Sequence, residues 1–121
     1  MAFNKVFGNL GEIVAIKKLK DEGYKILAEN YTYGKGEIDI IAEKDDVVVF
    51  IEVKYRNSLN FGSPIDSYTR SKAKQIRKIA EAYLYQKEIT NKEIRFDFVG
   101  IVPAGDNIKF EVEHIKNVMD Y

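Results

Sequence analysis

Two apolar segments that both carry carboxylates flank a short charged turn, and this feature constrains the fold more than any other. The segments 37–43 (EIDIIAE) and 47–56 (VVVFIEVKYR) are rich in the β-branched residues typical of strands. Residues 44–46 (KDD) have the composition of a tight turn, and a connection this short joins antiparallel neighbours. We therefore expect a hairpin in which Asp39 and Glu52 lie near the same end of two adjacent strands.

The remaining hydrophobic patterns add two helices and three strands to this hairpin. A helix is predicted over residues 4–22, because Gly23 follows in the position that commonly ends a helix. A second helix is predicted from about residue 64 to residue 87, with Pro64 in its first turn. Alternating patterns predict the other strands, at residues 24–32, 95–103 and 108–115. The predicted order is α, β, β, β, α, β, β.

Length and composition limit the class of protein. The 121 residues fit a single domain over residues 1–121, and 45% hydrophobic with 31% charged residues is ordinary for a folded globular protein. No segment resembles a signal peptide or a membrane span, so a cytoplasmic location is expected. Because 19 basic residues balance 19 acidic ones, any binding of nucleic acid must depend on local charge.

The absence of cysteine restricts the metal chemistry. The chain has neither a disulfide nor a thiolate metal site, so a metal would be held by oxygen ligands or by His114, its one histidine. Oxygen ligands favour a hard ion such as Mg²⁺ or Mn²⁺.

Asp39, Glu52 and Lys54 suit metal-assisted hydrolysis of a phosphodiester. Side chains two positions apart on a strand share a face about 7 Å apart, which applies to Glu52 and Lys54. Carboxylates bind Mg²⁺, the ion activates water, and a lysine stabilises developing charge or orients the water. The alternative interpretation of Glu52 and Lys54 is an ordinary charged pair on the solvent face of a strand.

Each predicted helix carries one charge on a face that otherwise looks buried. Glu12 shares a face of the first helix with Ala15, Ile16 and Leu19. Lys72 shares a face of the second helix with four apolar residues, Ile65, Ile76, Ile79 and Tyr83. Glu12 either points inward or is partly exposed with its stem over the sheet. Lys72 either reaches toward a phosphate or extends past the core to solvent.

Other charged residues have simpler interpretations. Pairing of Glu37 with Lys35 or Lys54 is favoured over direct metal ligation. His114 is more typical of a packing residue than of a catalyst. The second helix also has an exposed basic face, of the kind that is usually solvated, made of Arg70, Lys74, Arg77 and Lys78.

Together these features resemble the YraN-like family of the PD-(D/E)XK, restriction-endonuclease-like superfamily. The resemblance covers nearly the whole chain. Its motifs are Gly11-Glu12 with Ala15, Gly23-Tyr24, Gly36-Glu37-Ile38-Asp39, Glu52-Val53-Lys54 with Arg56, Gly62 with Pro64, and Arg95-Phe96-Asp97. It implies an α/β fold with a mixed central sheet flanked by helices, in which the strand 95–103 runs parallel to the strand 47–56.

The resemblance also implies roles for four residues. The superfamily's metal-binding acid falls on Asp39, its second acid on Glu52, its lysine on Lys54 and its helical acid on Glu12. Ile38 stands where the name of the motif has proline, a departure that leaves the carboxylates in place.

A Mg²⁺-dependent DNA endonuclease is the function that the resemblance implies, with Mn²⁺ as a substitute ion. The second helix lacks the Gln-X-X-X-Tyr pattern of recombination nucleases, since Gln75 is followed by Ile79. The chain is therefore more similar to Holliday-junction resolvases, which favours branched or damaged DNA as substrate. Phosphates are expected to contact Arg56, Lys72, Lys74 and Lys78. Symmetric cuts in both strands would require a homodimer. The alternative function is a non-catalytic module that binds nucleic acid or protein.

Overall fold

The computed structural model describes residues 2–57, 62–105 and 109–119, and the elements follow the predicted order. They are α1 (Ala2–Asp21), β1 (Lys25–Tyr33), β2 (Gly36–Lys44), β3 (Val47–Tyr55), the short 3-10 helix η1 (Pro64–Ser67), α2 (Arg70–Gln86), β4 (Glu93–Ala104) and β5 (Lys109–Ile115). The first residue of the predicted fifth strand, Ile108, lies outside the described residues. No helix in this part of the chain is long and apolar enough to cross a membrane.

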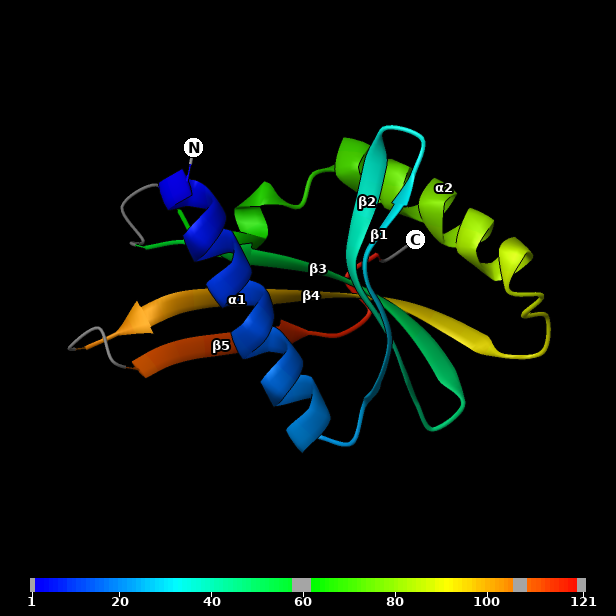
Figure 1. The fold of residues 1–121 in the computed structure, drawn as a ribbon, viewed down its shortest axis with the longest axis horizontal. Helices are drawn as coiled ribbons and strands as arrows, with labels where there is room; N and C mark the ends of the chain where they lie inside the picture. The colour runs from blue at the N-terminus through cyan, green and yellow to red at the C-terminus, as the bar shows by residue number, and fades with distance from the viewer. Residues whose placement is uncertain (1, 58–61, 106–108, 120–121) are drawn as a thin grey trace.

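The strands form one five-stranded mixed sheet in the order β1-β2-β3-β4-β5 (Figure 1). β3 and β4 are parallel, with Val47 opposite Glu93 and Tyr55 opposite Ile101, and the other neighbouring strands are antiparallel. η1 and α2 lie in the connection from β3 to β4. The predicted parallel pairing is confirmed, and the arrangement is consistent with a restriction-endonuclease-like fold.

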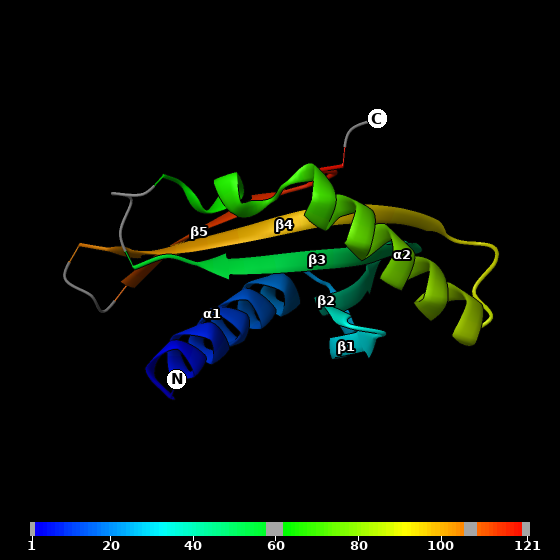
Figure 2. The same cartoon turned by 90° about the horizontal axis from the view of Figure 1, so that it is seen from above.

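α1 and α2 lie on opposite faces of the sheet (Figure 2), α1 mainly against β3 and α2 mainly against β2. On one face, Ala15 of α1 belongs to a buried cluster with Val99. On the other face, Ile79 of α2 belongs to a cluster with Phe50. Because strands that are covered on both faces bury every side chain, the start of β3 is continuously apolar instead of alternating.

The second predicted helix is interrupted, so the prediction of one helix from residue 64 to residue 87 is wrong at its start. η1 ends at Ser67 and α2 begins at Arg70. The Thr69 hydroxyl accepts a hydrogen bond from the Lys72 N–H at 3.1 Å, and its extended backbone caps a new helix. Lys72 consequently lies in the first turn of α2.

β2 separates from β3 part-way along both strands. Their ladder joins residues 40–44 to residues 47–51, although β2 begins at Gly36 and β3 continues to Tyr55. β2 stays paired with β1 as far as Gly36, so the β1–β2 hairpin turns away from β3 as a unit (Figure 1).

The side chains of β2 show the same change in the direction of the strand. Ile38 and Ile40 would share a face in a regular strand, but Ile38 packs in the α2 cluster and Ile40 packs in the α1 cluster. The strand is therefore strongly twisted at Asp39. We call the opening between residues 36–39 of β2 and residues 52–55 of β3, where the two strands are no longer paired, the fork.

Candidate active site at the fork between β2 and β3

The Asp39 carboxylate lies where the β2–β3 ladder ends. Its Oδ2 accepts a hydrogen bond from the Val53 backbone N–H at 2.8 Å, which gives this donor a partner beyond the end of the ladder. Burial raises the pKa of Asp39 to about 8, and the charges of Glu52, Glu12 and Glu37 act in the same direction. The Val53 hydrogen bond lowers the pKa but does not offset these causes. Asp39 is thus surrounded by carboxylates, as its predicted position implied.

Glu52 is the most buried acid of the fork, with 8% of its surface exposed. Its Oε2 lies 2.7 Å from the Nζ of Lys72. Lys72 therefore turns inward, and its partner is a carboxylate of the protein instead of solvent. The prediction identified the inward position of Lys72 but missed this ion pair, which no local sequence pattern signals because 20 positions separate the two residues.

Glu12 approaches the fork from α1. A close approach of helix and sheet allows this, because a Cβ on Gly11 would lie only 3.1 Å from the Cβ of Tyr55. Burial raises the pKa of Glu12, a hydrogen bond with Asn30 opposes the shift, and the charges of Glu37, Glu29 and Glu52 add to it. Glu12 is half-buried, a position that fits both interpretations of this residue, and its pKa shows that it lies within reach of the charges at the fork.

Lys54 and Glu37 lie beside these acids. Lys54 is half-buried on β3, two residues after Glu52, whereas Glu37 is exposed near the start of β2. Within the described ranges Glu37 forms no ion pair with Lys35 or Lys54, so the favoured interpretation of Glu37 is wrong. Its charge acts on Asp39 and Glu12 instead.

The predicted phosphate-binding residues occupy three different environments. Lys72 is paired with Glu52, while Lys74 and Lys78 are exposed on α2. Arg56 is half-buried after β3, where its backbone N–H donates to the Ile101 carbonyl at 2.9 Å. The Nε of Arg56 is buried and has no hydrogen-bond partner among the residues that the structure describes.

The donors of the fork fit a hard divalent cation by their chemistry. Asp39, Glu52 and Glu12 offer only carboxylate oxygens, the ligands that Mg²⁺ and Mn²⁺ prefer. Their mutual repulsion is the condition that a bound cation relieves. In residues 2–57, 62–105 and 109–119, however, no three acidic or histidine side chains are already grouped as metal ligands are. Glu52 faces Lys72 instead.

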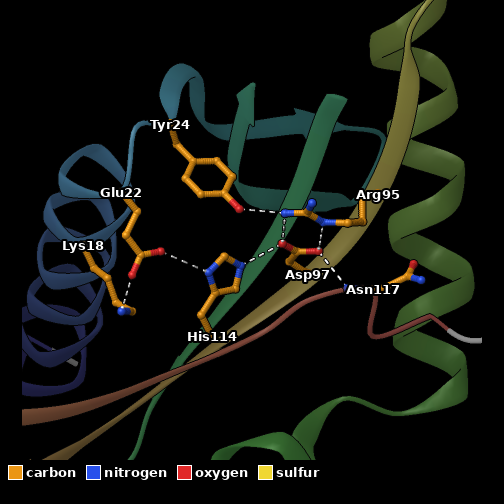
Figure 3. A network of polar contacts seen from close by, with 7 residues as sticks. All are labelled: Lys18, Glu22, Tyr24, Arg95, Asp97, His114 and Asn117. Carbon is orange, nitrogen blue, oxygen red and sulfur yellow. Dashed lines mark hydrogen bonds and ion pairs between the residues drawn. The ribbon is translucent and has the colours of Figure 1, made fainter. Parts of the chain in front are cut away.

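A second polar network lies around Asp97 on β4 (Figure 3). Asp97 is fully buried, and its two oxygens accept hydrogen bonds from Arg95 Nε at 2.9 Å and Arg95 Nη2 at 2.8 Å. The Asn117 backbone N–H donates to Oδ1 at 3.0 Å, and His114 Nε2 lies 2.7 Å from Oδ2. Burial alone would raise the pKa of Asp97, but the hydrogen bonds from His114, Arg95 and Asn117 outweigh burial and lower it.

This network connects segments that are distant in the sequence. Arg95 Nη2 donates to the Tyr24 hydroxyl at 2.7 Å, and His114 Nδ1 lies 3.9 Å from Glu22, just after α1. The ends of α1 and β5 are thereby joined to β4 and to the residue that precedes β1 (Figure 3). The prediction of His114 as a packing residue missed these contacts. The signal available in the sequence was a charged pair, Arg95 and Asp97, inside an apolar strand.

Comparison with known proteins decides the family. The model of the uncharacterised protein family UPF0102 matches residues 11–101, a range that contains Glu12, Asp39, Glu52 and Lys54. The chain belongs to this family. The predicted YraN-like resemblance is confirmed, and the name of the family states no activity.

Relatives match this UPF0102 chain over most of their length. A UPF0102 protein of Dictyoglomus turgidum is 44% identical over 110 residues, covering 89% of this chain and 93% of the relative. One of Clostridium perfringens is 44% identical over 115 residues, covering 95% and 94%. One of Persephonella marina is 39% identical over 118 residues, covering 98% and 97%.

In the metal-free protein, Asp39→Asn is expected to raise the free energy of unfolding by on the order of 3 kcal/mol near pH 9. A carboxyl with a folded pKa of about 8 stabilises the fold fully only below its unfolded pKa of about 3.9, and this contribution is lost as the pH rises through 8. Asparagine does not titrate and can still accept the Val53 N–H.

Urea unfolding with a chelator, from about pH 5 to about pH 9, measures this difference, which should grow with pH. Asp45→Asn in the exposed β2–β3 turn is the matched control and should change stability by less than about 0.5 kcal/mol. A less stable Asp39→Asn protein near pH 9 would show that the Asp39 carboxylate stabilises the fold.

Asp97→Asn is expected to lower the free energy of unfolding by about 3 kcal/mol at neutral pH, because it removes the charge that Arg95 and His114 face. The pKa of Asp97 is lowered, so its stabilisation is present above the unfolded pKa of about 3.9 and is lost as the pH falls through the folded pKa. Wild type and variant should therefore converge in acid. Tyr24→Phe, which removes one acceptor from Arg95, should cost only about 1 kcal/mol. Equal stability of Asp97→Asn and wild type at neutral pH would contradict this role.

Proposed function

We propose that this chain is a metal-dependent DNA endonuclease of the cytoplasm that uses Mg²⁺, with Mn²⁺ as a substitute. The observation that carries the proposal is the position of Asp39 at the end of the β2–β3 ladder, close enough to Glu52 of β3 and Glu12 of α1 for their charges to raise its pKa. Burial and mutual repulsion raise the pKa of Asp39 and of Glu12, which a cation bound between them would reverse. Carboxylates held together at such a cost are typical of functional sites.

Each residue of the fork has a distinct role in this proposal. Asp39 and Glu52 hold the cation, and Glu12 completes its ligands. A cation bound there would supply an activated water and would polarise the phosphoryl oxygen. The Val53 N–H fixes the orientation of the Asp39 carboxylate. Lys54, two residues after Glu52 on β3, orients the attacking water or stabilises the charge that develops on the phosphate.

Contacts with the DNA backbone supply most of the binding. The predicted contacts are Arg56, Lys72, Lys74 and Lys78, and such contacts give an affinity that falls steeply with salt. The described elements include no recognition helix or zinc finger, so recognition follows the shape of branched or damaged DNA instead of base sequence. Cuts in both strands require two active sites, hence a homodimer.

One contact favours the alternative, a non-catalytic binding module. Lys72 neutralises Glu52 at 2.7 Å, so this part of the fork is satisfied without a metal. A module of this kind would bind nucleic acid or protein and show no affinity for Mn²⁺ at the fork. Calorimetric titration of the protein with Mn²⁺ separates the two functions before any substrate is found.

Replacing Asp39, Glu52 or Lys54 with alanine is expected to lower the rate of metal-dependent cleavage by about 100-fold or more, because each removes a ligand or a catalytic charge. Glu12→Ala should cost less, since a water can replace one carboxylate around Mg²⁺. The assay is a panel of linear, nicked, flapped and four-way DNA, and RNA, with Mg²⁺ or Mn²⁺. Glu111→Ala, an exposed acid of β5, is the control and should cleave at the wild-type rate. Wild-type cleavage by the Asp39 or Glu52 variant would remove the fork from the mechanism.

Lys72→Met is expected to bind Mn²⁺ about tenfold more tightly than wild type, a difference of about 1.4 kcal/mol. Methionine keeps the apolar stem but removes the ammonium group that competes with a cation for Glu52. The chelated variant should also melt at a lower temperature, because Glu52 is left buried without a partner. Lys74→Met, exposed on the same helix, should bind Mn²⁺ like wild type. Unchanged or weaker Mn²⁺ binding by Lys72→Met would show that the ion does not bind at Glu52.

A further inference from the structure

A groove next to the fork lies between the β1–β2 turn and α2. It has a volume of about 500 Å³, and its lining includes Tyr33 and Lys35 from the turn and Lys74, Gln75 and Lys78 from the helix. A volume of this size accommodates a small molecule or part of a flexible strand, and it is too small for a double helix.

The groove is a local positive surface on a chain with no net charge. Three lysines, Lys35, Lys74 and Lys78, contribute to its lining, and no carboxylate does. None of the three forms an ion pair with another residue that the structure describes. Their charges are therefore available to an anion.

Tyr33 adds an aromatic surface to the same groove. It is the last residue of β1 and one of the exposed large hydrophobic residues, with 48% of its surface accessible. In the described part of the chain its ring is stacked on no other ring. An exposed tyrosine among lysines is the combination that binds single-stranded nucleic acid, because each base offers a flat face for stacking and each phosphate a negative charge.

Gly36 permits a close approach of the turn to α2. A Cβ on Gly36 would lie 2.7 Å from Nε2 of Gln75 and 2.8 Å from Cδ1 of Ile79, so only glycine permits this approach without displacing those side chains. The two walls of the groove are thereby kept at a short distance.

The groove and the fork are close to each other along β2 and α2. Gly36 precedes Asp39 by three residues on β2, about 10 Å of strand. Lys74 follows Lys72, the partner of Glu52, by two residues on α2. A nucleic-acid strand in the groove would reach the carboxylates within about three nucleotides at the 3.4 Å rise of a stacked strand.

We infer that the groove binds a single-stranded DNA segment that adjoins the duplex cut at the fork, with its phosphates on Lys35, Lys74 and Lys78 and a base on Tyr33. The inference rests on the proposed function, since it takes that segment to be part of the nuclease's substrate. An intact duplex keeps its bases stacked inside and offers none to Tyr33. The substrate class is therefore duplex DNA with a flap or an unpaired end.

Binding measured by fluorescence anisotropy in a chelator tests the inference without requiring cleavage. The probes are a flapped duplex, a blunt duplex of the same sequence, and the flapped duplex with an RNA flap. Wild type should bind the DNA flap about tenfold or more tightly than the blunt duplex. Tyr33→Leu should lose about tenfold of its affinity for the flap only, because a base then has no ring to stack on, while Tyr33→Phe keeps the ring and the affinity.

Two further variants complete the design. Tyr85→Leu is the matched control, an exposed tyrosine of α2 that does not line the groove, and it should bind like wild type. Changing Lys35, Lys74 and Lys78 together to glutamine should lower the slope of log affinity against log salt for the flap by about 2, and by less for the blunt duplex.

The inference is overturned if Tyr33→Leu binds the flap like wild type, or if it loses affinity equally for flapped and blunt duplex. It is overturned as a DNA site if the RNA flap binds more tightly through Tyr33. The proposed function fails independently. If the protein selects flaps through Tyr33 but binds no Mn²⁺, the inference about the groove stands and the proposed nuclease function fails. If the protein cuts DNA with metal but does not select flaps, the nuclease function stands and the inference about the groove fails.

Discussion

The hydrogen bond from the Val53 N–H to the Asp39 carboxylate is the contact on which the fork depends. A ladder that ends in the middle of a sheet leaves backbone donors without strand partners, and a buried donor without a partner costs about 1 to 3 kcal/mol. Asp39 supplies an acceptor where the backbone of β2 has turned away. The same carboxylate is the central candidate ligand. Asp39 thus has two roles. It accepts a hydrogen bond where β2 and β3 separate, and it is the candidate ligand for a cation at the fork.

The two buried acids, Glu52 and Asp97, differ in how many partners they have. On the α2 side, Glu52 is buried, and Lys72 is its one cationic partner among the residues that the structure describes. Asp97 is more deeply buried, yet it accepts hydrogen bonds from Arg95 and from the Asn117 backbone and has His114 within hydrogen-bond distance. A carboxylate with all its acceptor sites filled holds a structure together, whereas one that depends on a flexible lysine can exchange its partner. The number of filled acceptor sites, more than burial itself, distinguishes Asp97, the structural acid, from Glu52, the candidate catalytic acid.

The sequence was sufficient for those parts of the fold that depend on local patterns. Alternation, turn composition and glycine positions predicted each helix and strand, and the resemblance implied the parallel pairing of β3 and β4, which the structure confirms. The break between η1 and α2 escaped prediction because Pro64 suits the first turn of a helix, whereas the α-helix begins only after the Thr69 cap. The Glu52–Lys72 pair and the Asp97 network join residues far apart along the chain, and only the assembled sheet brings them together.

Charge separation between the fork and the groove couples the proposed metal and DNA sites. Above about pH 8, where Asp39 is ionised, the carboxylates at the fork repel phosphate while they lack a cation, and the lysines of the groove attract it a few residues away. A strand held only by the groove would therefore stop short of Asp39 and Glu52 until a divalent ion reverses the charge there. Lys72 lies at the boundary, and once a cation occupies Glu52 its ammonium group is free to meet the phosphate instead. On this argument metal and DNA each favour the binding of the other, although the chain as a whole carries no net charge.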